Sequence, residues 1–194
     1  MEKINRLINK IVIALKTNNI ILEEDSDIYS YGLEILISNL FLLLTIMVVG
    51  IIFGKLQYTL LFLMIFMGLR RTTGGYHTKK RWQCFCLTHV LHGIIIGLTM
   101  LDCTYVMNEL VFICVIFSVS IVYVAAPIEN ENNPKTPAEI IKNRIKSRVM
   151  ISILAIITLA GFYGGESYKL ICSTIAMTMT LVGILLLVPY IEEW

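Results

Sequence analysis

The stretch LEILISNLFLLLTIMVVGIIFG, at residues 33–54, decides the class of fold. It is almost uninterrupted apolar sequence, and a helix needs about 20 such residues to cross a bilayer core of ~30 Å. Of the 194 residues, 57% are hydrophobic and 15% are charged, against ~25% charged residues in soluble globular domains. The mean hydropathy is +0.77. This composition excludes a soluble globule, a disordered tail and a disulfide-dense secreted module, and it indicates a membrane protein with several spans.

Five further apolar runs follow the first, each bounded by charged residues or helix breakers. Runs of this kind satisfy their backbone hydrogen bonds in lipid by forming helices. The sequence therefore predicts an all-α, polytopic membrane protein with six transmembrane helices. The second run is short because Arg70 follows it, so it needs flanking residues or local thinning of the bilayer to cross. The predicted spans are 33–54, 56–69, 84–101, 110–126, 149–163 and 170–188.

Lysine and arginine are unevenly distributed over this layout. Four lie before the first span, five in 70–83 and five in 127–148, out of 16 in the whole chain. Only Lys55 and Lys169 are left for the opposite side of the membrane. By the positive-inside rule, we expect both termini and both basic loops in the cytoplasm of the cell. We expect one membrane domain over 1–194, with paired spans at 33–69, 84–126 and 149–188.

The N-terminal segment, 1–22, is amphipathic. Its apolar residues recur at the spacing of one helical face, with lysine, arginine and asparagine around the rest. We expect an interfacial helix in the inner leaflet, where basic side chains meet anionic lipid. The alternative is a cytosolic helix that packs on the spans. The apolar face consists of Ile4, Leu7, Ile8, Ile11, Val12 and Leu15.

The segment RRTTGGYHTKKRWQC, at residues 70–84, carries the candidate chemistry. A thiol reacts as a nucleophile when it is a thiolate, which a helix N-terminus and nearby cations favour. Cys84 has both, and His77 is a candidate general base. On one straight helix the two would lie about 10.5 Å apart along the axis, so the break at Gly74-Gly75 must fold His77 back toward Cys84. The alternative is an ordinary basic loop in which Cys84 is a small residue at a helix start.

The remaining cysteines and histidines favour structural roles. Cys86 and Cys114 are expected to be small core residues. His89 and His92 lie in the third predicted span, and together with Cys86 they could in principle ligate a metal. We expect instead that both imidazoles bond to neighbouring spans, and we predict no metal site.

Two further features concern charge. Glu34, at the start of the first span, is costly in lipid unless it is at the interface or pairs with a cation such as Arg70 or Arg71. The basic loop at 127–148 begins with a turn-rich stretch, and a helix is expected over 137–148. Its cations face lipid headgroups or, alternatively, an acidic peptide partner.

A set of short elements along the chain is typical of one membrane-protein family. These elements are Tyr31-Gly32-Leu33-Glu34, Arg70, Gly74-Gly75-x-His77, Cys84, Ala126-Pro127 and Asn133-Pro134-Lys135. With them the chain resembles the accessory gene regulator B (AgrB) family, whose members are membrane cysteine endopeptidases that process quorum-sensing propeptides in Gram-positive bacteria. The length, the amphipathic start and the six-span layout are also similar, so the resemblance covers nearly the whole chain.

The resemblance implies that His77 and Cys84 form a catalytic dyad, which cuts an AgrD-like propeptide at the cytoplasmic face. The peptide stays on Cys84 as a thioester until its own cysteine or serine closes a thiolactone or lactone ring. We expect the bilayer, the propeptide and a second copy in a homodimer as partners, with no cofactor and no nucleic acid. Supporting residues would be Arg70, Gly74, Gly75 and Glu34, and substrate contacts Arg71, Lys79, Lys80, Arg81, Pro127 and Lys135.

Two alternatives from other classes of protein stay open. A small transporter or permease would use His89 or His92 in its pathway and would not require Cys84. A non-catalytic membrane scaffold would require no single polar residue. No inverted repeat relates the first three spans to the last three, which weighs against the transporter.

Overall fold

The computed structural model is all-α, as the sequence predicts, and it describes residues 2–18, 20–74, 81–100, 104–128 and 135–192. Each predicted span overlaps one helix, although the helix of the second span continues past Arg70 and that of the sixth continues past Pro189. The expected helix at 137–148 also forms, but it continues without a break into the fifth span. Within the described residues the helices are α1 (Glu2–Thr17), α2 (Ser26–Ile52), α3 (Leu56–Thr73), α4 (Arg81–Met100), α5 (Thr104–Ala125), α6 (Pro137–Tyr163) and α7 (Glu166–Glu192).

Four helices in the described part of the chain are long and apolar enough to cross a membrane. They are Ser26–Ile52, Trp82–Met100, Pro137–Tyr163 and Tyr168–Pro189. Helix α3 is not among them, since Arg70 and Arg71 occupy its last turn. The apolar part of α5 among the described residues is Leu110–Ala125, which is shorter than these four helices. The presence of several apolar helices agrees with membrane insertion, and the count of six crossings stays a prediction.

The chain forms two compact units, Met1–Val48 and Val49–Trp194. In the first unit, Ile8 and Val12 of α1 are buried against Ile21, and the partly buried Leu33 and Ile37 of α2 pack on them. This part of the amphipathic face therefore contacts protein, which favours the packed helix over a face immersed in lipid.

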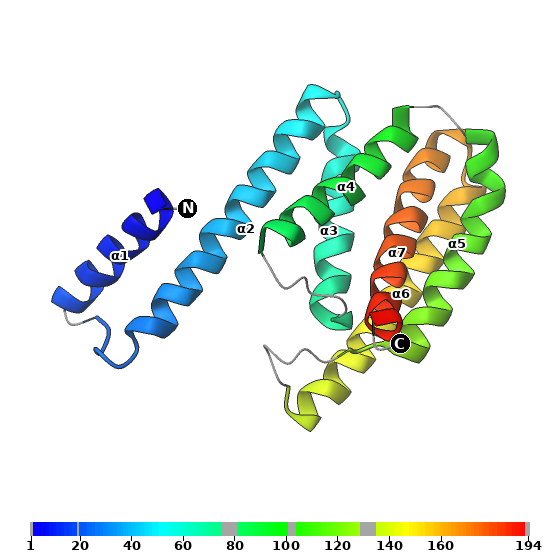
Figure 1. Cartoon of the computed structure of the whole chain (residues 1–194). Helices are drawn as coiled ribbons and strands as arrows, with labels where there is room; N and C mark the ends of the chain where they lie inside the picture. The colour runs from blue at the N-terminus through cyan, green and yellow to red at the C-terminus, as the bar shows by residue number, and fades with distance from the viewer. Residues whose placement is uncertain (1, 19, 75–80, 101–103, 129–134, 193–194) are drawn as a thin grey trace. The chain divides into compact units, whose positions relative to one another are not determined.

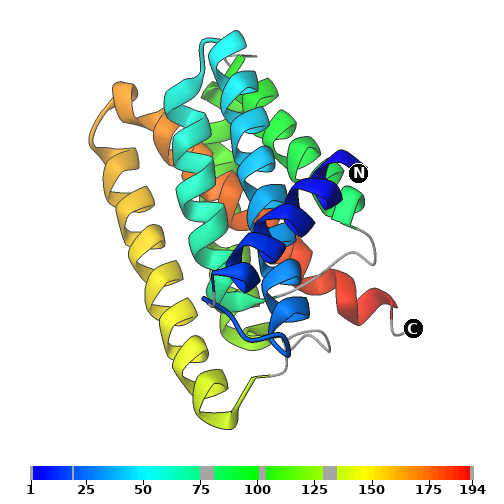
Figure 2. The ribbon, with the colours of Figure 1, turned by 90° about the vertical axis from the view of Figure 1, so that its left-hand side faces the viewer.

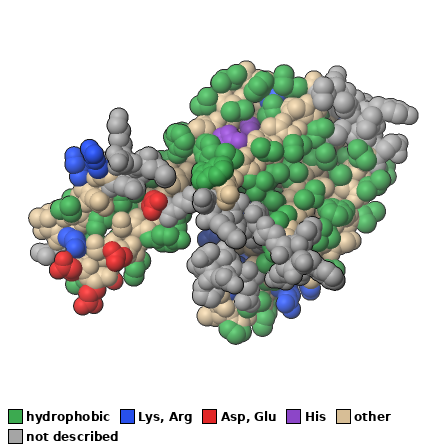
Figure 3. Space-filling view, in the orientation of Figure 1, with side chains coloured by type: hydrophobic (Ala, Val, Ile, Leu, Met, Phe, Trp, Pro, Cys, Tyr) green, Lys and Arg blue, Asp and Glu red, His purple; other side chains and the backbone are tan. Residues whose placement is uncertain are grey.

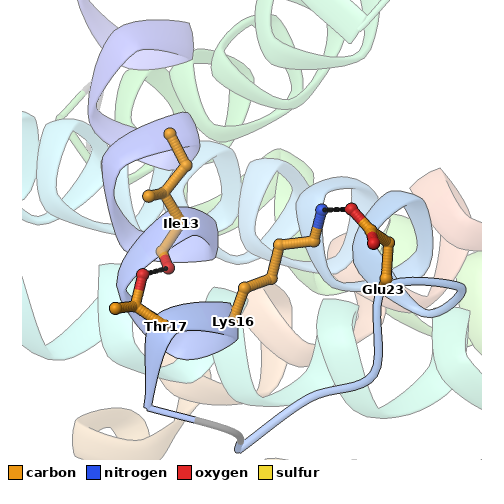
Figure 4. A network of polar contacts seen from close by, with 4 residues as sticks. All are labelled: Ile13, Lys16, Thr17 and Glu23. Carbon is orange, nitrogen blue, oxygen red and sulfur yellow. Dashed lines mark hydrogen bonds and ion pairs between the residues drawn. The ribbon is translucent and has the colours of Figure 1, made fainter.

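A few polar contacts close the end of α1 (Figure 4). The Lys16 Nζ lies 3.1 Å from the Glu23 Oε1, and the Thr17 hydroxyl donates to the Ile13 carbonyl oxygen at 2.8 Å. The ion pair links the last turn of α1 to the segment that leads from α1 into α2.

In the second unit, α7 packs against α3, α4, α5 and α6 (Figures 1 and 2). The centre is apolar, with Phe62, Ile95, Ile151 and Met179 almost entirely buried. The outer surface is apolar too: green side chains cover most of the visible face of this unit (Figure 3). On α6, for example, Val149, Ile153 and Ile156 are more than half exposed. A helix that is apolar both toward its neighbours and away from them is typical of a membrane span.

The C-terminal ends of α3 and α5 and the N-terminal end of α6 lie at one end of this unit (Figures 1 and 2). A backbone hydrogen bond joins the end of α3 to the segment that follows α5, since the Ile128 N–H donates to the Thr73 carbonyl oxygen at 2.9 Å. The two basic segments, 70–83 and 127–148, therefore begin at the same end of the unit. This is expected, because α4 leads the chain away from that end and α5 leads it back.

Candidate active site

Cys84 lies in the first turn of α4, because that helix begins at Arg81. Its thiol is free and the residue is exposed. The first turn of a helix presents backbone N–H groups without a partner in the helix, and this partial positive charge favours a thiolate. The described part of α4 thus begins three residues before the predicted span, and the activation of Cys84 by a helix N-terminus stays a prediction.

Arg70, in the last turn of α3, is the cation that the fold brings near Cys84. Burial lowers the pKa of the Arg70 guanidinium, and the negative charge of the Cys84 thiolate raises it. The guanidinium keeps its charge at physiological pH in any case, since arginine does not lose its proton in proteins. Its Nη1 donates to the Gly74 carbonyl oxygen at 3.1 Å. Arg70 therefore connects the end of α3 with the start of α4.

Gly74 ends α3 and begins the segment that carries His77. Its φ of 68° lies in the left-handed region, where glycine has no steric penalty. Its N–H donates to the Arg70 carbonyl oxygen at 3.1 Å, and Gly74 forms a parallel β-bridge with Ile128. A methyl group at Gly74 would overlap the Ile128 carbonyl oxygen. The predicted helix break is confirmed at Gly74, and the structure adds the partner that requires a glycine there.

Several predicted site residues lie outside the described residues, or have side chains that are not described. Gly75, His77, Lys79 and Lys80 fall in the first group, so the geometry of the His77–Cys84 dyad stays a prediction. Arg81 is the first residue of α4, and its side chain belongs to the second group.

The other predicted site residues are described. Arg71 is exposed, and Pro127 and Lys135 are half-buried at either side of the undescribed stretch 129–134. Glu34 belongs to the first compact unit, whereas Arg70 belongs to the second. Pairing between Glu34 and Arg70 therefore stays a prediction.

The two histidines of α4 have structural partners. The His92 Nε2 lies 2.9 Å from the Thr59 Oγ1 of α3, and the ring, almost entirely buried, is 5.5 Å from that of Phe62. The His89 Nδ1 lies 2.9 Å from the Phe85 carbonyl oxygen on its own helix. The prediction that an imidazole bonds to a neighbouring span is confirmed for His92, whose partner Thr59 belongs to α3.

The prediction that Cys86 is a core residue is wrong, since Cys86 is exposed. It lies in the early part of α4, where Trp82 and Cys84 are exposed too. Cys114 is half-buried, and its Sγ lies 3.8 Å from the Met177 Sδ of α7. Within the described ranges, no three His, Cys, Asp or Glu side chains group together as metal ligands would.

An apolar groove of about 520 Å³ lies between α3 and α6. Thr72 lines it from α3, and side chains between Ile145 and Leu154 line it from α6. Its described lining includes neither Arg70 nor Cys84. The candidate chemistry is therefore at the exposed start of α4, outside this groove.

Comparison with known proteins decides the family. The family model described as Accessory gene regulator B matches residues 5–187. The chain belongs to the AgrB family. Membership implies a role in the processing of quorum-sensing propeptides, together with an AgrD-like propeptide, and AgrB proteins are membrane proteins.

Three relatives illustrate the similarity. The putative AgrB-like protein 2 of Clostridium perfringens is 26% identical, over 96% of this chain and 94% of the relative. The putative AgrB-like protein 1 of the same organism is 29% identical, over 76% of each chain. The protein FsrB of Enterococcus faecalis is 35% identical over 28% of this chain and 22% of its own length. No solved structure matches the chain.

Proposed function

We propose that this AgrB protein is a cysteine endopeptidase that removes the C-terminal tail of an AgrD-like propeptide and closes the remaining peptide into a ring. The observation that carries the proposal is the position of Cys84. Its exposed thiol lies in the first turn of α4, within electrostatic range of Arg70. The α3 helix ends at Thr73, four residues before His77 in the sequence, which leaves a short tether for a base.

The first half of the reaction transfers the peptide to the enzyme. The Cys84 thiolate attacks the carbonyl carbon of the scissile peptide bond, and its proton resides on His77. As the C–N bond breaks, His77 donates that proton to the leaving amine of the tail. The products are the free tail and a thioester between Cys84 and the rest of the propeptide.

The second half of the reaction regenerates the free enzyme. A cysteine thiol or serine hydroxyl within the bound peptide loses its proton to His77 and attacks the thioester carbonyl. The bond to the Cys84 sulfur breaks, so the ring closes as a thiolactone or lactone and Cys84 leaves as a thiolate. The thioester keeps the acyl group activated, and ring closure outcompetes hydrolysis when the internal nucleophile is held next to it.

The charges at this end of the molecule suit an acidic tail. Arg71 is exposed at the end of α3, and α6 carries Lys142, Arg144 and Lys146 on its exposed first turns. Cations around the mouth of a site raise the local concentration of an anionic segment and fix its direction. We include Lys79, Lys80 and Arg81 among these cations from their place in the sequence.

The test compares two neighbouring exposed cysteines. Cys84→Ala and Cys84→Ser should abolish release of the tail from an AgrD-like propeptide. The matched control Cys86→Ser should retain it, because Cys86 is also exposed but lies about 200° around the helix. With the wild-type protein, a rapidly denatured sample should contain a hydroxylamine-sensitive adduct with the mass of enzyme plus truncated peptide. Tail release by Cys84→Ala would refute the proposal.

A further inference from the structure

The apolar groove between α3 and α6 opens on the surface of the second unit. Its volume is about 520 Å³, which lies in the range of small-molecule sites, about 300–1,000 Å³. Side chains between Ile145 and Leu154 line it from α6, and Thr72 lines it from α3. Val149 and Ile153, which belong to this lining, are more than half exposed. The groove is therefore accessible from the outside of the helix bundle.

The body of the groove suits a hydrocarbon chain. The Thr72 hydroxyl donates to the Leu69 carbonyl oxygen at 3.0 Å, within its own helix. Met150, also in the lining, packs on Gly68 of α3, where a methyl group would overlap its Cε. The lining residues other than Thr72 and Lys146 have apolar side chains. A polar ligand would lose its hydrogen bonds with water here and find few in exchange.

The groove occupies one half of the apolar length of α6. Lys146 marks one end of this length, and at the other end the Lys169 ammonium lies 5.6 Å from the centre of the Phe162 ring. At about 1.5 Å per residue, α6 rises about 24 Å from Lys146 to Phe162, which is close to the ~30 Å hydrocarbon core of a bilayer. The groove, at 145–154, extends over about 14 Å of this rise. It thus matches the depth of one leaflet.

The direction and the charge of the groove distinguish between occupants. The groove follows α6, and a helix that crosses the bilayer runs in the direction of the acyl chains. An amphipathic peptide lies in the plane of the membrane instead, so it would cover one end of the groove alone. At that end Lys146, which is exposed, lines the groove. Its ammonium complements a phosphate at the level of the lipid headgroups.

We propose that the groove between α3 and α6 binds a phospholipid with an anionic headgroup: one acyl chain lies in the groove, and the headgroup phosphate pairs with the Lys146 ammonium. This distinguishes Lys146 from Lys142 and Arg144, which are also exposed but are not among the described lining residues. The proposal is independent of the peptidase function, because the described lining does not include Cys84.

Photocrosslinking tests the site directly. Full-length protein is reconstituted in phosphatidylcholine vesicles that contain a phosphatidylglycerol probe with a diazirine in one acyl chain, and adducts are mapped by mass spectrometry. Adducts on Ile153 and Leu154 should exceed those on Val124 of α5. Val124 is the control at similar depth, because the Tyr123 hydroxyl lies 2.9 Å from the Ser152 Oγ of α6. It is also 87% exposed, against 51% for Ile153, so equal or greater labelling of Val124 would indicate surrounding lipid only and overturn the proposal.

A pair of charge variants tests the headgroup contact. Lys146→Gln should lower the groove adducts about fivefold, since one cation near the headgroups contributes a factor of that size. The matched control, Arg144→Gln, removes an equal charge from the same exposed turns and should change the adducts by less than about twofold, because solvent and salt screen it. Equal losses in both variants would mean general attraction to the membrane surface and would overturn the proposal. Lys146 is exposed, so this pair stays decisive if a bulkier variant fails to fold.

A pair of tryptophan variants tests the groove itself. Ile153→Trp places bulk in the groove and should remove most adducts from Leu154. Ile157→Trp adds the same bulk about one turn further along α6, at a side chain that is also 51% exposed but not in the described lining, and should leave them unchanged. Adducts that survive Ile153→Trp would overturn the proposal. Displacement of the probe by an AgrD-like propeptide, or a disulfide between two copies of Ile153→Cys, would assign the groove to another occupant and overturn it too.

Discussion

At the scale of single residues, the sequence marks Cys84 and Arg70 separately, and the fold brings them within electrostatic range of each other. Cys84 stands out because a thiol follows a cluster of cations and opens an apolar run. Arg70 stands out only as the charge that ends the second run. Their proximity depends on how α3 and α4 pack, which no local pattern contains. The same holds for Cys86, whose exposure depends on how far neighbouring helices cover the first turns of α4.

A prediction at this scale concerns the charge on Arg70. Arg70→Gln should slow alkylation of Cys84 by iodoacetamide roughly fivefold, because a unit charge close by contributes on the order of 1 kcal/mol even in water. Arg70→Lys should lose less, since it keeps the charge but not the planar donor that bonds the Gly74 carbonyl oxygen. Arg71→Gln is the matched control, because Arg71 is the next residue and is exposed. Equal rates in Arg70→Gln and Arg71→Gln would contradict the role of Arg70.

At the scale of elements, α6 shows how local rules determine one helix end. Thr136 is the N-cap, Pro137 occupies the first turn, and the Thr136 and Glu139 side chains each bond the other residue's backbone N–H. This capping box starts the helix outside the apolar stretch that begins at Val149. The sequence analysis placed this start correctly, since it expects a helix from residue 137 after the turn-rich stretch. It cannot show that α6 then continues unbroken to Tyr163.

The cap makes the start of α6 sensitive to pH. Hydrogen bonds from the Thr136 backbone and side chain hold the pKa of the Glu139 carboxyl below its ordinary range. The ionised Glu139 carboxylate therefore stabilises the start of α6 fully at a pH above the ordinary glutamate pKa. This stabilisation is lost as the pH falls through the lower pKa that Glu139 has in the folded protein. Amide-exchange protection in the first turn of α6 should therefore drop as the pH falls from above the ordinary glutamate pKa to below the lowered pKa of Glu139 in the folded protein. Glu139→Gln should remove this pH dependence, and protection that falls equally in both proteins would disprove it.

At the scale of the whole molecule, the charge distribution and the packing agree on which ends belong together. The cations of 70–83 and 127–148 were assigned to one side of the membrane from their number alone. The bond between Ile128 and Thr73 brings the beginnings of those two segments into contact. The side of the membrane that this end faces remains a prediction of the positive-inside rule.

Labelling of thiols in intact cells tests that orientation. A membrane-impermeant maleimide applied from outside should modify Cys103, which is expected between the third and fourth spans. It should leave Cys84 and Cys86 unmodified, although both are exposed on the protein surface. After permeabilisation, Cys84 and Cys86 should react as well. Modification of Cys84 in intact cells would contradict this orientation, because it would place Cys84 and the proposed active site at the outer face.

The sequence by itself determined the helices, their breaks and the candidate nucleophile. These depend on local properties: an apolar run forms a helix in lipid, and a glycine such as Gly74 ends it. Only the tertiary structure decided that Ile128 pairs with Gly74, that Arg70 lies near Cys84 and that His92 bonds Thr59. Each of these contacts joins different helices or the segments beside them. These contacts form only when particular faces of the helices pack together. The sequence does not mark these faces, because apolar residues surround the helices on all sides, so the packing is decided by how closely the side chains fit.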